Sequence, residues 1–378
     1  MLGLLLALAS AEAGTMTVHM LDVGQGDALL LELPGGEKVL IDAGVKGAHV
    51  VDTLGLLGVQ ELDLVVTSHA HADHMGGMRD VVMRIPIGTY VDSGVPHTTK
   101  TYKELMEAVH ARHLTYQPAR KGQLFEYEEV TIEVLWPGQS MMSGTRSDLN
   151  SNSVVLRVDH GEDCFLFTGD AEAPTEEALL QGGRVGECEV LKVAHHGSHH
   201  SNTDSFLRTV DPEIALISCG LGNRYKHPGI ETTEALGRLE TAIYRTDLTG
   251  HITLESSGHG IVVVEGLPAD PHIGPVGDDR AALAAIGPST SRTALGAQPS
   301  ARPELSRDLD AGVPAQVEVE IEIEIEGEPK DVAEGSDIDL SGVRAGADTP
   351  DIQPEPPLGL IARIRAWRAR RKVEKETE

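Results

Sequence analysis

The chain has 378 residues and a formal net charge of −28, from 59 acidic and 31 basic side chains. This length is enough for one large or two ordinary domains with an ample core. The acidity favours solubility and argues against unaided binding to polyanions such as long DNA. Residues 267–378 contain 22 acids and 13 bases, so residues 1–266 keep a net charge of −19.

The N-terminal stretch is an apolar run, Leu2 to Leu8, followed by small residues in A-x-A patterns that end at Ala11 and Ala13. This order resembles the end of a secretory signal, although no Lys or Arg precedes the run. We therefore expect residues 1–14 to be a signal peptide and the protein to be periplasmic or secreted. The alternative is a cytoplasmic protein with an ordinary N-terminus. No other stretch approaches the ~20 apolar residues of a membrane span.

Residues 15–266 alternate between strand-like and helix-like segments. Period-2 alternation and short apolar runs between turn residues predict strands. They lie within 17–44 (three strands), 62–68, 130–137, 153–170, 187–196, 213–220 and 250–265. A helical period predicts helices at 102–113 and 173–183, the second with Pro174 in its first turn. Runs of strands broken by helices predict a two-sheet core flanked by helices.

From residue 267 the composition changes to Pro, Ala, Gly, Asp and Ser without apolar periodicity. This predicts a disordered acidic linker over 267–357. Residues 358–378 predict a basic amphipathic helix that either contacts an anionic membrane surface or a partner, or has no role of its own. The three cysteines, Cys164, Cys188 and Cys219, are too few and too scattered for a disulfide framework, so we predict three small core residues.

The stretch TSHAHADHMGG (67–77) places His69, His71, Asp73 and His74 directly after an apolar strand. A turn at this point projects several imidazole and carboxylate groups toward one place, which suits Zn²⁺ or a similar divalent ion. A tetrahedral site takes only four ligands, so these four residues would already fill it and leave no place for ligands from other parts of the chain. The pattern therefore favours two adjacent metal ions.

The H-x-H-x-D-H pattern resembles the signature of metallo-β-lactamase-fold hydrolases, which are αββα sandwiches with the metal site at one edge of the sheets. The segment FTGDAE (167–172) resembles the Gly-Asp element of the family, which implies that Asp170 bridges both metals. The segment LKVAHHGS (191–198) resembles a later histidine element, which implies that His195 or His196 is a ligand.

One branch of the family has further matching segments, over roughly residues 16–264. HMLDVGQGDALLLE, LIDAG, NSVVLRV, FTGD, KVAHHGSHHSN, ISCGLGNRYKHP and YRTDLTGHITL resemble, in this order, the hydrolase domain of the ComEC-type competence proteins. Those proteins are channels that take up transforming DNA. The multi-span channel has no counterpart here, so we expect a stand-alone relative without a transmembrane channel.

Two departures from the family pattern affect the metal site. Many enzymes of this fold carry another ligand histidine before the Gly-Asp element, but residues 143–153 contain none. Asn152 or Ser153 is the candidate for that place and for contact with substrate. His71 stands where many ComEC-type domains carry aspartate, which makes the first site more zinc-like.

The resemblance implies two divalent cations, Zn²⁺ or Mn²⁺, and displacement at phosphorus. The first ion is expected to be held by His69 and His71. The second is expected to be held by Asp73, His74 and one of His195/His196, with Asp170 bridging the two ions. Asp73 also counts among the catalytic residues. His227 and His199 are candidates for protonating the leaving oxygen, and Arg224 and Lys226 for holding a phosphate. Each of these four is equally compatible with a solvated loop residue. Asp42 is interpreted as support for a ligand, and Gln25 and Asp27 as turn-shaping.

Three function classes follow. The first is a metal-dependent phosphodiester hydrolase, with DNA among its candidate substrates. The second is a hydrolase of a small or cell-envelope phosphoester, thioester or lactam, which the net charge of −19 on residues 1–266 favours. The third is a non-catalytic binding module, against which the complete H-x-H-x-D-H pattern argues.

Overall fold

The computed structural model describes residues 14–266 and 268–269. The chain divides into two units, residues 1–301 and 302–378, and all described residues belong to the first. The predicted signal peptide before Gly14, and nearly all of the predicted linker and terminal helix, lie outside the described residues. Within the described ranges no helix has both the length and the apolarity to cross a membrane.

The first sheet joins the N-terminal strands to two late ones. Its strands are β1 (Met16–Met20), β2 (Leu29–Glu32), β3 (Lys38–Ile41), β4 (Leu62–Thr67), β5 (Ile87–Asp92), β6 (Thr115–Pro118), β14 (Ile252–Ser256) and β15 (Ile261–Glu265). Their order is β15-β14-β1-β2-β3-β4-β5-β6, and β3 to β6 run parallel. The parallel strand β4 is buried along nearly all its length, because both its faces are covered.

The second sheet contains the middle of the chain. Its strands are β7 (Leu124–Glu126), β8 (Val130–Trp136), β9 (Val155–His160), β10 (Asp163–Phe167), β11 (Val190–Lys192), β12 (Ile214–Ile217), β13 (Ala242–Arg245) and β16 (Pro268–Ala269). Their order is β16-β13-β12-β11-β10-β9-β8-β7, with β10 to β13 parallel. Because β16 pairs with β13, this sheet continues three residues past the predicted domain boundary at 266.

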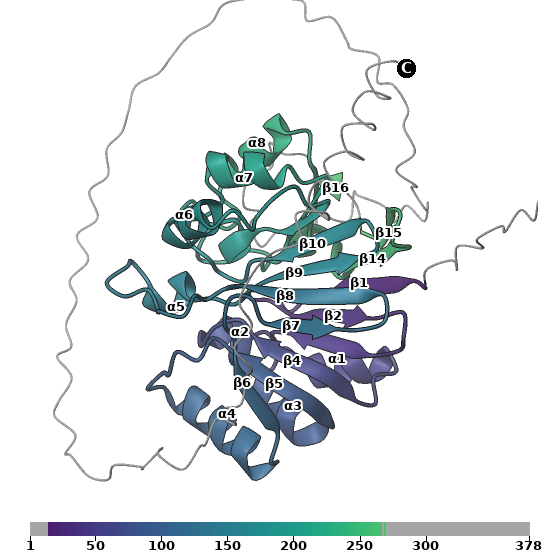
Figure 1. Cartoon of the computed structure of the whole chain (residues 1–378), viewed down its shortest axis with the longest axis vertical. Helices are drawn as coiled ribbons and strands as arrows, with labels where there is room; N and C mark the ends of the chain where they lie inside the picture. The colour runs from purple at the N-terminus through teal and green to yellow at the C-terminus, as the bar shows by residue number, and fades with distance from the viewer. Residues whose placement is uncertain (1–13, 267, 270–378) are drawn as a thin grey trace, which may run out of the picture. The chain divides into compact units, whose positions relative to one another are not determined.

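Helices cover the outer face of each sheet (Figure 1). Those of the first half are α1 (Val50–Leu56), α2 (Ala72–Met75), α3 (Met78–Arg84) and α4 (Lys100–Ala111). Those of the second half are α5 (Asp148–Ser151), α6 (Ala173–Gln181), α7 (Asp204–Val210), α8 (Ile230–Arg238) and α9 (Thr246–Thr249). Helices α1, α3 and α4 lie on the first sheet and α6, α7 and α8 on the second, whereas α2 and α5 lie at the edge of the sandwich. Three apolar clusters separate the layers. One lies between the sheets, one under α1, α3 and α4, and one under α6, α7 and α8. The predicted αββα sandwich is therefore confirmed.

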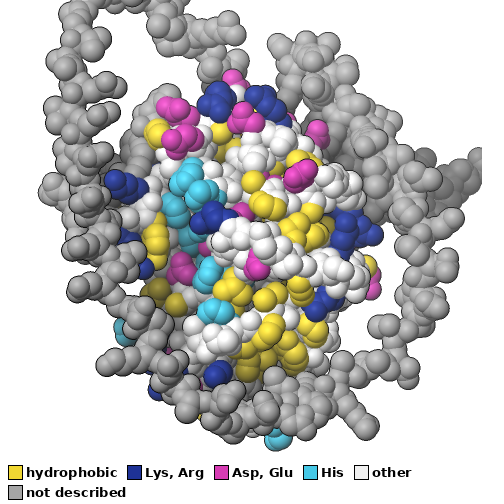
Figure 2. Space-filling view, turned by 90° about the vertical axis from the view of Figure 1, so that its left-hand side faces the viewer, with side chains coloured by type: hydrophobic (Ala, Val, Ile, Leu, Met, Phe, Trp, Pro, Cys, Tyr) yellow, Lys and Arg dark blue, Asp and Glu magenta, His cyan; other side chains and the backbone are white. Residues whose placement is uncertain are grey.

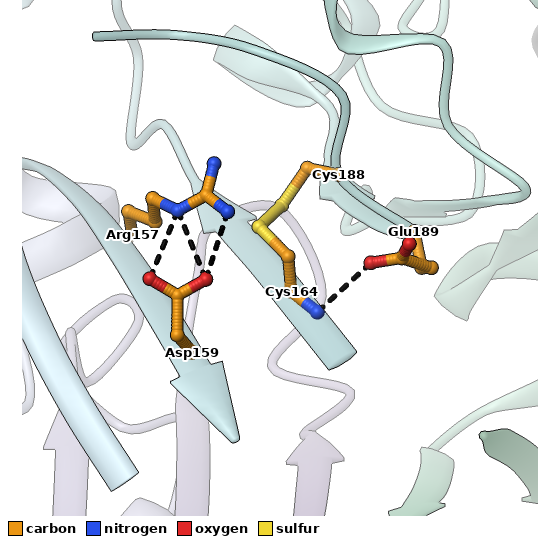
Figure 3. Close-up of a disulfide and its surroundings, with 5 residues drawn as sticks. All are labelled: Arg157, Asp159, Cys164, Cys188 and Glu189. Atoms are coloured by element: carbon orange, nitrogen blue, oxygen red, sulfur yellow. Dashed lines mark hydrogen bonds and ion pairs between the residues drawn. A yellow bond between two sulfur atoms is a disulfide. The ribbon is translucent and has the colours of Figure 1, made fainter. Parts of the chain in front are cut away.

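The cysteine prediction is wrong for two of the three residues. Cys164 and Cys188 form a disulfide, with their Cα atoms 4.9 Å apart (Figure 3). The cysteines are 24 residues apart in sequence, but β10 and β11 are parallel neighbours, so their amino-terminal ends lie side by side. The backbone N–H of Cys164 also donates to the Glu189 carboxylate (2.9 Å). Cys219 is free and buried, as predicted.

Candidate metal centre

Loops that follow five strand ends meet at one edge of the sandwich. Strands β3 and β4 are parallel neighbours in the first sheet, and β10, β11 and β12 are parallel neighbours in the second. The segments after them begin at Asp42, Ser68, Thr168, Val193 and Ser218. Carboxyl ends of parallel strands are where α/β sheets bind ligands. The disulfide lies at the opposite, amino-terminal end of β10.

The loop after β4 carries the H-x-H-x-D-H residues into the short helix α2. His71 is its N-cap residue, and Asp73 and His74 lie within it. The turn before β2 packs directly against this helix, since the backbone N–H of Asp27 donates to the Asp73 carbonyl (3.1 Å). Gly26 permits this approach. Its φ is 141°, and a Cβ there would lie 2.2 Å from the same carbonyl oxygen.

The loop after β11 presents two adjacent histidines. The prediction of a strand over 187–196 is wrong beyond Lys192, where a 3₁₀ turn (Ala194–Gly197) replaces it. His195 and His196 both adopt left-handed backbone conformations, with φ of 51° and 55°. Two such residues in succession cannot continue a strand. Their rings are inclined at 70° to each other, and their Nε2 atoms lie near different oxygens of Asp170.

The structure brings the other six predicted ligand residues together around the carboxylate of Asp170. Its Oδ2 lies 3.8 Å from His69 Nε2 and 3.6 Å from His195 Nε2. His71 Nδ1 completes this group, 2.9 Å from His69 Nε2.

A second group of ligand atoms surrounds the other oxygen of Asp170. Asp170 Oδ1 lies 3.2 Å from His74 Nε2 and 3.6 Å from His196 Nε2. His196 Nε2 is also 3.6 Å from Asp73 Oδ2. The two oxygens of one carboxylate therefore face different histidines, although atoms of His69, His74 and Asp170 also lie within 4.8 Å of one another.

Several of these atoms contact one another as ion pairs but make no hydrogen bond within the described part of the protein. His74 Nε2, His196 Nε2 and Asp170 Oδ1 are buried and have no hydrogen-bond partner among the described residues. Buried polar atoms are normally satisfied, so three that converge on one point indicate that something else binds there. Imidazole nitrogens and carboxylate oxygens are ligands that Zn²⁺ and related divalent ions prefer. The residues present therefore fit a divalent metal centre.

The Nδ1 atoms of His74 and His196, on the side of each ring away from the centre, contact other residues of the protein. His74 Nδ1 contacts Asp42 Oδ2 (2.8 Å), and Asp42 also accepts hydrogen bonds from the backbone and hydroxyl of Ser68. His196 Nδ1 contacts the carbonyl oxygen of Ser218 (2.8 Å). Partners of this kind fix ring orientation and direct Nε2 toward a metal. Asp42 therefore lies behind His74, as the interpretation of Asp42 as support for a ligand requires, and the role of His74 as a ligand stays a prediction.

His195 has a weaker partner of the same kind, the carboxylate of Glu172 at the start of α6. Its Nδ1 lies 3.5 Å from Glu172 Oε1. Glu172 is buried and also accepts hydrogen bonds from Asn150 and Arg146. Burial raises the pKa of Glu172, but hydrogen bonds from these three residues outweigh it and lower the pKa to about 2. An ionised carboxylate therefore stands behind His195.

A buried ion pair beneath the centre was missed in the sequence. The Lys192 ammonium group contacts the Asp27 carboxylate and donates to the carbonyl oxygen of Gly169 (2.9 Å). Asp27 Oδ1 also lies 3.3 Å from His196 Nδ1. Asp27 is thus part of the site, not only a turn-shaping residue. A lysine inside the apolar run before His195 was the available signal.

The electrostatics favour an ionised Asp170 and a neutral His69. Burial raises the pKa of Asp170, but the fields of His74, His196 and His195 outweigh it and hold that pKa well below its ordinary value. Burial lowers the pKa of His69 well below its usual range, and repulsion from His74 adds to this. Asp170 and His69 are therefore in the protonation states of metal ligands. Burial lowers the pKa of His74 and of His196, but nearby carboxylates, that of Asp170 first, outweigh it. They raise the pKa of His74 well above its usual value and that of His196 to about 9, so both imidazoles would release a proton on binding a metal.

The residues predicted for proton transfer lie at different depths. The His227 ring is 5.5 Å from that of His195 and 6.1 Å from that of His196. Burial, followed by repulsion from His196 and His195, lowers the pKa of His227 to about 4. His199 is exposed, and its ring lies 3.9 Å from that of His200. Only His227 thus borders the ligand group.

The residues predicted for substrate contact differ in how close they lie to the metal centre. Arg224 and Lys226 are exposed on the loop that contains His227. The Ser153 hydroxyl accepts a hydrogen bond from the backbone N–H of Asp170 (3.3 Å), so it lies against the bridging residue. The Asn152 amide is used within its own loop, where it pairs with the N–H and carbonyl groups of Met142 (2.9 and 2.8 Å).

The family model of the metallo-beta-lactamase superfamily matches residues 21–221. Competence protein ComA of Neisseria gonorrhoeae is 34% identical over 238 residues, which are 62% of this chain and 31% of ComA. ComE operon protein 3 of Bacillus subtilis is 27% identical over 255 residues, which are 62% of this chain and 32% of that protein. The chain thus spans about a third of the length of these relatives.

Among solved structures, CmlA, a diiron beta-hydroxylase from Streptomyces venezuelae, matches with a TM-score of 0.45 and 13% identity. The match covers 65% of this chain and 55% of CmlA. The assignment to a family rests on the sequence match and not on this likeness.

Proposed function

This chain belongs to the metallo-beta-lactamase superfamily, whose members are generally metal-dependent hydrolases, and from that membership we propose that it hydrolyses phosphodiester bonds with two divalent cations, Zn²⁺ or Mn²⁺. The observation that carries the proposal is the placement of Asp170, whose two oxygens face different histidines. Divalent cations at such a centre polarise a phosphoryl oxygen and provide a nucleophile from water at neutral pH.

The ligand sets are inferred from which histidines approach each oxygen of Asp170, and His71 and Asp73 are added through their contacts with His69 and His196. His69, His71 and His195 would hold one ion, and Asp73, His74 and His196 the other. In this assignment both adjacent histidines are ligands, one for each ion. His195 takes the role of the histidine that many enzymes of the fold carry before the Gly-Asp element. The satisfied amide of Asn152 supports this, because it is not directed to the metal centre.

The remaining residues would bind and protonate the substrate. Arg224 and Lys226 would contact phosphate oxygens, since guanidinium and ammonium groups are strong donors to phosphate. His227 would donate a hydrogen bond to the leaving oxygen, because its ring borders those of His195 and His196. Its pKa is lowered to about 4 in the free protein, so to transfer a proton it would first have to become an imidazolium, a form that a bound anionic phosphate favours. Ser153 would orient Asp170 through the backbone contact already described. His199 remains the second candidate for proton transfer.

The substrate is proposed to be a phosphodiester of the DNA type, from the resemblance to the competence proteins. One observation favours a different substrate class. The net charge of −19 on residues 1–266 suits a small phosphoester, thioester or lactam better than a long polyanion.

Purified, metal-reconstituted protein should be assayed against bis-p-nitrophenyl phosphate, single-stranded DNA, duplex DNA, a thioester and a β-lactam. Turnover of the phosphodiesters supports the proposal. Turnover of only the thioester or lactam would replace it with the alternative, and turnover of none would favour a non-catalytic binding module.

We also infer that the protein works in an oxidising compartment, periplasmic or extracellular. The disulfide between Cys164 and Cys188 supports this, because such bonds are rare in reducing cytosol. The apolar run followed by A-x-A is a second, independent indication. Protein from its native host, denatured without reductant, should have one thiol per chain that reacts with an alkylating reagent. Three reactive thiols would indicate a cytoplasmic protein. Membrane contact through 358–378 stays a prediction from sequence.

A further inference from the structure

The loop between β12 and α8 is held in a fixed shape by one side chain. The Asn223 amide donates to the carbonyl oxygens of Gly220 (2.8 Å) and His227 (2.7 Å). Its carbonyl oxygen accepts from the backbone N–H of His227 (2.9 Å). Arg224, Tyr225 and Lys226 therefore form the tip of a closed loop, and all three are exposed.

A row of near-parallel rings connects this tip to the metal centre. The ring of His196, a predicted ligand, lies 6.1 Å from that of His227, at 27°. The ring of His227 lies 5.8 Å from that of Tyr225, at 26°. Tyr225 is thus the outermost ring of the row. It contacts His227, which borders the ligand group.

Tyr225 belongs to none of the three apolar clusters of the described residues. Its side chain is 51% exposed, and it is the only aromatic among the exposed large hydrophobic side chains of the described residues. Tyr90, by contrast, is buried and pairs its hydroxyl with Thr67 (2.8 Å). The chain is only 3% aromatic, so an exposed aromatic ring beside the metal centre points to a binding role.

Positive charge accompanies the exposed ring. The Arg224 guanidinium carbon lies over the Tyr225 ring, 4.8 Å from its centre, and Arg224 Nη2 donates to the Tyr225 hydroxyl (2.7 Å). A base that stacks on this ring must therefore displace the guanidinium, which is then free to contact the phosphate. Lys226 follows directly. Figure 2 shows histidine side chains gathered on one face of the protein with Lys and Arg side chains beside them. On an acidic protein, two cations flanking an aromatic ring suit a ligand that has both an anionic group and a flat ring.

We propose that Tyr225 and Arg224 form a stacking platform for an unpaired nucleobase next to the phosphodiester at the metal centre. The substrate would then be a single-stranded nucleic acid, because paired bases do not offer their faces to a side chain. This inference rests on the proposed function but goes beyond it, since a phosphodiesterase needs no base-binding element. It also reconciles an acidic protein with a polyanion, as stacking gives affinity that does not depend on net charge.

The test measures binding before turnover, so that it does not depend on catalysis. Metal-loaded protein is mixed in a stopped-flow instrument with a single-stranded oligonucleotide that contains 2-aminopurine, whose fluorescence reports stacking. An abasic oligonucleotide of equal length, used as a competitor, gives the affinity without bases. Tyr225→Ala should weaken binding of the base-bearing strand by about 5- to 100-fold, toward the abasic value, while Tyr225→Phe keeps most of it. The matched control is Leu124→Ala, a 52% exposed apolar residue on the edge strand β7, which should change nothing.

Equal affinity of the wild-type protein for base-bearing and abasic strands would overturn the platform, as would a folded Tyr225→Ala variant that binds like the wild type. A duplex of the same sequence should show no dependence on Tyr225, and equal dependence would contradict recognition of unpaired bases. If no phosphodiester is hydrolysed but base-dependent binding persists, the proposed function fails and the platform stands.

Discussion

His195 and His196 are neighbours in the chain, yet their Nε2 atoms approach opposite oxygens of the same carboxylate, each at 3.6 Å. The arrangement requires left-handed backbone at both positions, with φ of 51° and 55°. One pair of adjacent residues can thereby serve both halves of the metal centre.

Single substitution of either histidine should therefore weaken the binding of a different ion. Metal titration with a competing chromophoric chelator should show two sites in the wild type and one tight site in each of His195→Ala and His196→Ala. Asp73→Ala identifies which ion is lost. The double variant Asp73→Ala/His196→Ala should still have one tight site, because Asp73 and His196 belong to the same group of ligands. The double variant Asp73→Ala/His195→Ala should have no tight site, because each substitution removes a ligand of a different ion. Identical behaviour of the two double variants would contradict the assignment.

Lys192 should contribute to stability through Asp27. Lys192→Met leaves a buried carboxylate without its closest cation, so the free energy of unfolding should fall by roughly 3 kcal/mol in urea denaturation. Lys103→Met, on the exposed face of α4, is the control and should stay within about 0.5 kcal/mol. Adding Asp27→Asn to Lys192→Met should restore part of the loss. Failure to do so would mean that packing, not charge, explains the effect.

Reduction of the disulfide should lower stability without dismantling the metal centre. The bond closes a loop across 24 residues, and its loss should reduce the free energy of unfolding by about 3 kcal/mol. The metal content should persist, because the bond lies at the end of β10 remote from Asp170. Thermal unfolding with and without reductant, at fixed metal, checks this. An unchanged transition would show that the bond adds no stability.

His227→Ala should leave metal content intact and slow turnover by roughly 10²–10⁴-fold for substrates with poor leaving groups. The slowing should shrink for p-nitrophenyl esters, because p-nitrophenolate leaves without protonation. His199→Ala, with its exposed ring, should have a much smaller effect. Equal loss on good and poor leaving groups would instead indicate that His227 binds phosphate. No loss on either would make it a passive loop residue.

The layers could be predicted from local pattern, and the residues that meet at Asp170 could be predicted from the spacing of His69 to His74 together with the family resemblance. That these residues bind metal stays a prediction. Alternation identified strands such as β1, and the spacing of His69 to His74 predicted a metal-binding turn. Three features depend on chain segments that meet only in the fold. The Cys164–Cys188 bond requires β10 and β11 to be parallel neighbours, and the Asp27–Lys192 pair joins the turn before β2 to β11. The assignment of His195 and His196 requires their backbone conformation, which the residue types do not encode.

The central claim is that the Asp170 carboxylate belongs to two metal sites at once. The most direct test measures metal content by mass spectrometry and hydrolysis of bis-p-nitrophenyl phosphate in the same preparation of Asp170→Ala. Bound metal in this variant is expected to fall well below the proposed wild-type value of about two ions per chain, and hydrolysis is expected to be abolished with it, since both groups lose their shared anionic ligand. Two tightly bound ions in the variant, or substantial hydrolysis, would contradict this expectation.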